Sequence, residues 1–296
     1  MPLPDGVELL LAPNPSLMTG PGTNTFVVSD AEETGCVAID PGPDDAGHLA
    51  RIVAAAERHG GLRAILITHG HPDHVAGAAH LRALTGAPVL AFSREGVPDA
   101  DATLADDQVF LLGSRAIRAL YTPGHRFDHL CFLLEDSGAL FAGDLVAGVG
   151  TVVIIPPEGD LLDYLASLRR LRALAERPPE AAASGRPPTT GSSRRPPDAP
   201  TMRLILPAHG PEIADPAALL DEYLAHRQMR EDQIVAGLAG GPRTVDALVA
   251  EIYADVDPRL HPMAAQSVTA HLLKLEREGC AAREGSGAGE VWRLVD

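Results

Sequence analysis

Four side chains that commonly bind metals stand within six residues of one another, in the run Thr-His-Gly-His-Pro-Asp-His at 68–74. They are His69, His71, Asp73 and His74. The run follows Ala-Ile-Leu-Ile at 64–67, a short apolar segment typical of a buried strand. A loop at the end of such a strand brings its side chains into a small volume, where imidazole nitrogens and a carboxylate oxygen suit a divalent metal. The run therefore predicts a metal site at the end of a strand.

Three later loops add further candidate ligands, and each follows a strand-like run. They contain His125 in Thr122-Pro-Gly-His125, Asp144 in Phe141-Ala-Gly-Asp144, and His209 before Gly210. Loops at strand ends can meet at one edge of a sheet. The seven donors exceed what one tetrahedral zinc accepts, but they suit two ions that share a bridging carboxylate and a hydroxide. The residues alone thus predict a two-metal centre.

The apolar pattern predicts an α/β fold. Strands are expected at 24–28, 36–39, 64–67, 88–91, 109–112, 117–121, 130–134, 140–142 and 202–206, and helices at 47–58, 161–175 and 216–238. Two sets of strands, each with helices, predict a two-sheet sandwich that forms a catalytic domain over residues 1–225. Within it, residues 178–200 are rich in Pro, Gly, Ser and Arg and predict a flexible insertion.

Residues 226–296 follow a different pattern, with helices expected at 245–254 and 263–278 and a hairpin that pairs 280–283 with 290–294. This order predicts a winged-helix domain. Its eight basic residues are outnumbered by eleven acidic ones, which argues against sequence-specific DNA binding. We expect the module to pack against the metal-bearing face and to form one wall of the substrate cleft.

Composition narrows the function classes and the compartment. The chain carries 24 basic and 40 acidic residues, a net charge of −16, so it repels polyanions unless a local basic groove attracts them. Its three cysteines are widely spaced and form no disulfide framework or paired metal motif, which fits a reducing cytoplasm. No export signal or stretch of about 18 apolar residues is evident, so a cytoplasmic location without a membrane partner is expected.

The ligand motifs resemble, in their order, those of the metallo-β-lactamase superfamily, whose fold is an αββα sandwich. The runs Asn14-Pro-Ser, Gly22-Thr-Asn-Thr25 and 143–151, together with the winged helix, resemble its beta-lactamase-like protein 2 branch, which is of endoribonuclease type. The resemblance implies two zinc ions, with iron or manganese as replacements. It places His69, His71 and His125 on the first ion, Asp73, His74 and His209 on the second, and Asp144 between them. Asp73 and Asp144 would then be the catalytic residues.

For several other residues the sequence predicts either two possible roles or a purely structural role. Asp40 is either a turn residue or, by the resemblance, a support for the metal ligands, and Asn24 and Thr25 either line the pocket or cap a turn. We expect His129 to be buried beneath the site and bonded to an acid, and Cys131 to be a core residue. The remaining histidines are expected to be solvated or to cap helices; they are His48, His59, His80, His226, His261 and His271.

The sequence supports three function hypotheses, of which we favour the first, and it leaves the oligomeric state open. The first is cleavage of single-stranded RNA at a phosphodiester by a metal-bridging hydroxide, which the branch resemblance implies and the arginines at 169, 170, 172, 177, 194, 195 and 203 support. The net charge and only eleven aromatic residues oppose it. The second is hydrolysis of a small ester or thioester, such as an acyl-carrier or glutathione thioester. The third is a non-catalytic winged-helix regulator, which the mixed ligand set with room for water disfavours.

Overall fold

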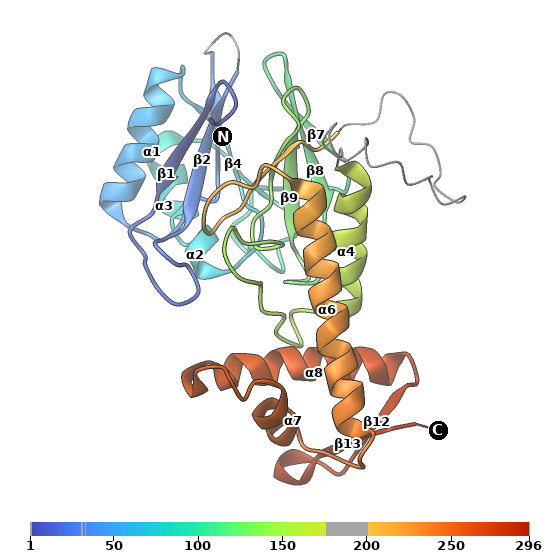
Figure 1. The fold of residues 1–296 in the computed structure, drawn as a ribbon. Helices are drawn as coiled ribbons and strands as arrows, with labels where there is room; N and C mark the ends of the chain where they lie inside the picture. The colour runs from blue at the N-terminus through green and yellow to red at the C-terminus, as the bar shows by residue number, and fades with distance from the viewer. Residues whose placement is uncertain (1, 31, 33, 176–200, 296) are drawn as a thin grey trace, which may run out of the picture.

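Two β-sheets pack face to face, helices cover the outer face of each, and a smaller helical unit lies at one end (Figure 1). The computed structural model describes residues 2–30, 32, 34–175 and 201–295. The αββα sandwich with a small C-terminal unit, which the sequence predicts, is confirmed. The insertion predicted at 178–200 lies outside the described residues.

The first sheet has six strands in the order β1-β2-β3-β4-β5-β6. The strands are β1 (Val7–Leu11), β2 (Asn24–Ser29), β3 (Cys36–Ile39), β4 (Leu62–Leu66), β5 (Val89–Ala91) and β6 (Ala102–Thr103). The pairs β1·β2 and β2·β3 are antiparallel, and the pairs from β3 to β6 are parallel. Helices α1 (Ala46–Arg58), α2 (Pro72–Val75) and α3 (Ala78–Thr85) follow β3 and β4 in the chain. The sequence patterns did not predict α2 and α3, because α2 is a single turn that contains the polar ligands and α3 buries only Ala78 and Leu81.

The second sheet has five strands in the order β11-β10-β9-β8-β7. They are β7 (Val109–Leu112), β8 (Arg115–Tyr121), β9 (Leu130–Leu134), β10 (Ala139–Phe141) and β11 (Leu204–Leu206). The pair β10·β11 is parallel, and the other three described pairs are antiparallel. Helices α4 (Leu161–Leu174) and α6 (Pro216–Leu238) cover its outer face, and carboxylates at the two N-caps, Asp160 and Asp215, accept bonds from backbone N–H groups of the first turns.

Alternation along the strands divides the core into layers. In β2, Phe26 and Val28 face the second sheet, whereas Val27 between them packs on the helix side with Leu49 of α1. Phe26 meets Phe141 of β10 between the sheets, with ring centroids 5.1 Å apart. Because apolar side chains project from both faces of these central strands, each sheet is buried on both sides.

The C-terminal unit contains α7 (Val245–Ile252), η1 (Pro258–Leu260), α8 (His261–Arg277), η2 (Gly287–Gly289) and the hairpin β12 (Ala281–Glu284) and β13 (Val291–Leu294). These elements pack around Trp292, which is 1 % exposed. The predicted winged helix is therefore confirmed. Residue 225, the predicted domain boundary, falls inside α6, which runs continuously from the sandwich into this unit (Figure 1). None of the described helices combines the length and the apolar character needed to cross a membrane.

Candidate metal centre

The seven predicted ligands lie on four loops that leave the carboxyl ends of strands in both sheets. His69 and His71 follow β4, and Asp73 and His74 lie in the one-turn helix α2. His125 follows β8, Asp144 follows β10, and His209 follows β11. The sandwich therefore brings together loops that are up to about 140 residues apart in the sequence, as the strand-end argument requires.

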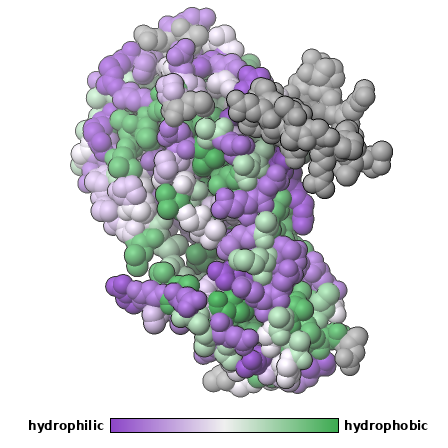
Figure 2. All heavy atoms as spheres, in the orientation of Figure 1, coloured by the Kyte–Doolittle hydropathy of each residue, from purple (hydrophilic) through white to green (hydrophobic). Residues whose placement is uncertain are grey.

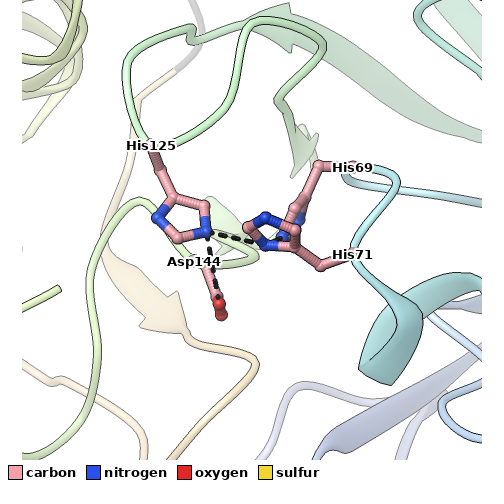
Figure 3. Close-up of side chains that lie close together, drawn as sticks. All are labelled: His69, His71, His125 and Asp144. Carbon is pink, nitrogen blue, oxygen red and sulfur yellow. Dashed lines mark hydrogen bonds and ion pairs between the residues drawn. The ribbon is translucent and has the colours of Figure 1, made fainter. Parts of the chain in front are cut away.

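The ligand atoms form two groups that share Asp144. One group is His69, His71, His125 and Asp144, and the other is Asp73, His74, Asp144 and His209; within each group the donor atoms lie within 4.8 Å of one another. Figure 3 shows the side chains of the first group pointing toward a common centre. The grouping is the one that the family resemblance implies.

The Asp144 carboxylate lies between the two groups. Its Oδ2 is 3.6 Å from Nε2 of His125 and 3.5 Å from Nε2 of His74. Its Oδ1 is 3.2 Å from Nε2 of His209. One carboxylate therefore faces histidines of both groups, which is the position that a bridging ligand requires.

Hydrogen bonds on the far side of each ring direct a nitrogen lone pair into the centre. His74 Nδ1 donates to Asp40 Oδ2 at 2.8 Å, and His125 Nδ1 donates to the carbonyl of Val153 at 3.1 Å. His209 Nδ1 faces the carbonyl of Gly22 at 3.4 Å. With Nδ1 protonated, Nε2 of each ring is free to bind a metal.

His69 and His71 offer different ring nitrogens. His69 Nδ1 lies 3.0 Å from Thr68 Oγ1, which itself donates to Asp40, so His69 presents Nε2 to the centre. His71 presents Nδ1, which lies 2.8 Å from Nε2 of His69 and 3.1 Å from Nε2 of His125. Three nitrogen atoms thus converge with Asp144 in the first group.

The electrostatics of the centre fit a bound cation. Burial lowers the pKa of His69 well below its ordinary value and that of His125 to about 4, so both rings are neutral at neutral pH. Burial opposes charge on His209 as well, but hydrogen bonds to Asp144 and Asp73 raise its pKa to about 9. Nε2 of His74 is buried and has no hydrogen-bond partner among the described residues. Two partly buried carboxylates, Asp73 and Asp144, face this partnerless imidazole nitrogen. The arrangement fits a divalent metal, which can replace the protons that otherwise balance the carboxylates.

Asp40 supports both ends of the ligand loop that follows β4. Its Oδ1 accepts from the backbone N–H of Thr68 at 2.8 Å, and its Oδ2 accepts from Thr68 Oγ1 at 2.7 Å and from His74. The side chain is 2 % exposed and its φ is 50°, a left-handed conformation that aspartate tolerates better than most residues. Of the two interpretations of Asp40, support of the ligands is the one that the contacts bear out.

Two glycines let the loops approach closely. Gly124 has a φ of +130°, and a Cβ there would collide with backbone atoms of Tyr164 in α4. Gly143 has a φ of +50°, and a Cβ would lie 2.7 Å from Nε2 of His129. Sterics therefore explain why a glycine precedes His125 and Asp144 in the sequence, because a Cβ at either glycine position would prevent the loop from placing the ligand where it lies.

Three of the other predicted roles need correction. His129 is fully buried beneath the site, but its partners are Thr122 Oγ1 and the backbone N–H of Asp144 rather than a carboxylate. Asn24 donates to the carbonyls of Pro207 and Gly210, both at 2.9 Å, and so holds the loop that carries His209. Thr25 donates to the carbonyl of Asp40. Asn24 and Thr25 thus neither line the pocket nor cap a turn.

His48 and His271 are buried rather than solvated, which contradicts the prediction for both. Each is 1 % exposed. His48 bonds Thr25 Oγ1 at 2.9 Å beneath the Asp40 loop, and His271 faces Glu231 at 3.4 Å between α8 and α6. One turn after His48 come the polar Arg51 and the apolar Ile52, and one turn after His271 come Lys274 and Leu275. The helical period alone therefore does not assign either histidine to the polar or the apolar face. His80 is exposed as expected and pairs with Asp44, and Cys131 is a core residue whose pKa burial raises to about 12.

A cavity of about 470 Å³ opens on the candidate metal centre. His125, Asp144 and His209 line it, and most of its remaining wall is apolar, including Leu17, Met18, Val149, Leu260 and Met263. Leu17 and Val149 are 84 % and 77 % exposed. Figure 2 shows hydrophobic residues gathered along the hollow between the large and the small unit. Sequence reasoning did not identify these apolar residues, since they come from separate segments that only the tertiary fold brings together.

A sandwich with a His/Asp cluster at the strand ends defines a metallo-hydrolase class of protein. Residues 18–186 match the Metallo-beta-lactamase superfamily, and residues 244–292 match the Beta-lactamase associated winged helix domain. The chain belongs to the metallo-beta-lactamase superfamily.

Curated relatives cover nearly the whole chain. Beta-lactamase-like protein 2 homolog of Drosophila melanogaster is 30% identical over 94% of this chain and 90% of its own length. Atrochrysone carboxyl ACP thioesterase of Aspergillus chevalieri is 32% identical over 99% of this chain and 90% of its own length. Lactamase-like protein adaB of Aspergillus niger is 30% identical over 98% of this chain and 86% of its own length.

Solved structures share the whole architecture. A metallo-beta-lactamase family protein from Thermus thermophilus aligns with a TM-score of 0.72 at 22% identity, over 98% of this chain and 99% of its own. A beta-lactamase domain protein from Burkholderia ambifaria aligns with a TM-score of 0.76 at 19% identity, over 100% of this chain and 93% of its own. These matches concern the fold alone.

Proposed function

We propose that this chain is a zinc-dependent hydrolase of esters or thioesters that carry an apolar acyl group. The observation that carries the proposal is the cavity at the metal centre, whose lining includes His125, Asp144 and His209 but no lysine or arginine among the described residues. An apolar wall beside a polar centre is what an acyl group joined to a reacting carbonyl requires. A phosphodiester backbone requires cationic contacts instead.

The seven side chains would hold two zinc ions, His69, His71 and His125 on one, Asp73, His74 and His209 on the other, and Asp144 on both. Two such ions would lower the pKa of a bound water and would stabilise negative charge on the attacked carbonyl group. The protein's own contribution is orientation: Asp40, Val153 and Gly22 fix the proton on the outer nitrogen of the rings they contact. Asp73, which is within 3.3 Å of His209 and 28 % exposed, can accept a proton from an attacking water.

Two of the seven arginines that support an RNA substrate in the sequence pair with neighbouring acids. Arg170 pairs with Asp106 at 2.7 Å and with Asp107 at 3.0 Å, and Arg172 pairs with Asp221 at 2.7 Å. Arg177, Arg194 and Arg195 lie outside the described residues. Paired surface arginines attract a polyanion weakly, because the nearby carboxylates cancel most of their field. An acyl substrate is therefore favoured over single-stranded RNA.

One relative supports an acyl substrate, since it is named as an ACP thioesterase and matches over 99% of this chain. An acidic protein needs no basic surface to accept a small thioester.

The test is hydrolysis of acyl-pantetheine thioesters of increasing chain length by the zinc-loaded protein, beside end-labelled single-stranded RNA. We expect kcat/KM to rise with chain length and the activity to vanish in Asp144→Ala, whose bound metal is measured in parallel. Leu17→Asp, a change at an exposed position of the cavity wall, should raise KM for the longest chain more than for the shortest. If the parent chain cleaves RNA and hydrolyses no thioester, and Asp144→Ala does not cleave RNA, the proposal is overturned in favour of the RNA hypothesis.

A further inference from the structure

A second cavity, of about 170 Å³, lies where the C-terminal unit meets the sandwich. It shares five lining residues with the cavity at the metal centre, namely Thr151, Val152, Val153, Leu260 and Met263. The two cavities are therefore neighbours with a common wall. Its volume far exceeds the ~15 Å³ that one water molecule needs.

The lining of this second cavity is basic, in contrast to the apolar wall of the first. Neighbouring positions on α6 contribute His226, Arg227 and Arg230, and no aspartate or glutamate is among the described lining residues. The two arginines concentrate positive charge in a chain whose net charge is −16, whereas burial lowers the pKa of His226 to about 4 and leaves its ring neutral. A local cationic concavity in an acidic protein attracts anions of suitable size.

The positive charges have no acidic partner in the part of the chain that the structure describes. Arg227 is 3 % exposed; it bonds the carbonyl of Val152 and lies over the Tyr164 ring at 5.1 Å. Arg230 bonds Gln233 and lies over the Tyr253 ring at 4.4 Å. The ion pairs found among the described residues include neither arginine.

Unsatisfied polar atoms accompany these charges. Nδ1 of His226 and Nε of both Arg227 and Arg230 are buried and have no hydrogen-bond partner within the described chain. Burying a guanidinium without a carboxylate is costly, and each partnerless donor adds to that cost. The nearest acid along α6, Glu231, is already engaged by Lys274 at 2.8 Å and by His271 at 3.4 Å. An anion in the cavity would supply the missing countercharge.

We infer that the second cavity binds an oxyanion carried by the substrate, a phosphate or a carboxylate, while the acyl group occupies the first cavity. The inference deepens the proposed function and rests on it for the acyl group. His226, Arg227 and Arg230 would then determine which leaving group the enzyme accepts. Arg230 is the residue to change, because it is less buried than Arg227 and bonds no backbone group of the 151–153 wall.

The kinetic test compares two thioesters with the same acyl group, acyl-pantetheine and acyl-4′-phosphopantetheine. We expect the parent chain to prefer the phosphorylated substrate by about ten- to a hundred-fold in kcat/KM, the effect of one or two charge-assisted hydrogen bonds. In Arg230→Gln the ratio of the two values should fall by about ten-fold, the loss of one charge-assisted hydrogen bond, mostly through KM of the phosphorylated substrate. Arg259→Gln is the matched control, since Arg259 is an exposed arginine of the same unit that pairs with Asp257, and it should keep the preference. A ratio that Arg230→Gln leaves unchanged would overturn the inference.

A binding test separates the anion site from the hydrolase activity. Thermal unfolding of the zinc-loaded protein is followed in phosphate, acetate and chloride at equal ionic strength. Phosphate should raise Tm more than chloride does, and Arg230→Gln should lose that difference while Arg259→Gln keeps it; phosphate held only by the metals would stabilise both variants alike and overturn the inference. Stabilisation by acetate instead identifies the anion as a carboxylate. If the phosphate effect depends on Arg230 but no thioester is hydrolysed, the anion site stands and the acyl proposal fails.

Discussion

Replacement of Asp40 by Asn should switch the proton on the ring that Asp40 holds. Asn keeps one oxygen to accept from the backbone N–H of Thr68, and it tolerates the left-handed φ of 50° at this position. Its amide group then replaces Oδ2, which accepts from His74 Nδ1 and from Thr68 Oγ1. Since an amide N–H cannot accept, His74 must turn its Nδ1 lone pair toward the amide and carry its proton on Nε2, the nitrogen that faces the centre.

Asp40→Asn should also change which nitrogen of His69 carries the proton. Thr68 Oγ1 would receive a bond from the new amide and donate its own proton to His69 Nδ1, which lies 3.0 Å away. Each metal group would then contain one histidine with a proton where its lone pair is needed. Loss of such outer contacts typically weakens metal binding by about 10- to 100-fold, or about 1.4 to 2.7 kcal/mol. Loss of the charge-assisted bonds should lower the free energy of unfolding by about 1–3 kcal/mol.

The assay is zinc competition with a chromogenic chelator, together with urea unfolding of the metal-free protein. Asp44→Asn is the matched control, because Asp44 also accepts from a histidine Nδ1 at 2.8 Å, that of His80, but on an exposed surface. It should change neither zinc affinity nor stability by more than about 0.5 kcal/mol. If Asp40→Asn binds zinc as tightly as the parent chain, Asp40 only closes a turn and the tautomer argument is wrong.

Three further predictions follow from the same contacts. Gly143→Ala should destabilise the fold by about 2–4 kcal/mol in urea unfolding, because its Cβ meets His129 and Thr68, whereas Gly150→Ala, also at positive φ but in open space, should cost only about 1 kcal/mol. Burial, with the Arg51 charge, lowers the pKa of His48 to about 4 in the folded protein. The contribution of His48 to the free energy of unfolding is therefore fully present above about pH 6.5, and up to about 3 kcal/mol of it is lost as the pH drops toward 4. His48→Gln should flatten this pH dependence, and an unchanged slope would contradict the prediction. Chelation should lower Tm yet preserve the far-ultraviolet circular dichroism, because the described core between the sheets contains none of the ligands; loss of secondary structure on chelation would show that the metals hold the fold together.

The ligand set and the strands that carry it could be predicted from the sequence. Each loop that carries candidate ligands follows a short apolar run, and a glycine adjoins His69, His71, His125, Asp144 and His209. This local pattern determines where a strand ends and a loop begins. The periodicity of residues 161–175 and 263–278 likewise predicted helices close to α4 and α8. Such features depend on neighbours within a few residues along the chain, so they can be read without the fold.

The sequence by itself thus determined the two-sheet architecture, the winged helix and the seven residues that meet at the centre. Only the tertiary structure decided which nitrogen each histidine offers, because the acceptors, such as Asp40 for His74 and Val153 for His125, lie 28 or more residues away in the chain. It also decided that His48 is buried, that Arg170 is neutralised, and that an apolar and a basic cavity adjoin. Burial, ion pairing and cavity walls arise from contacts between distant segments, and a one-dimensional pattern does not contain the distances between them.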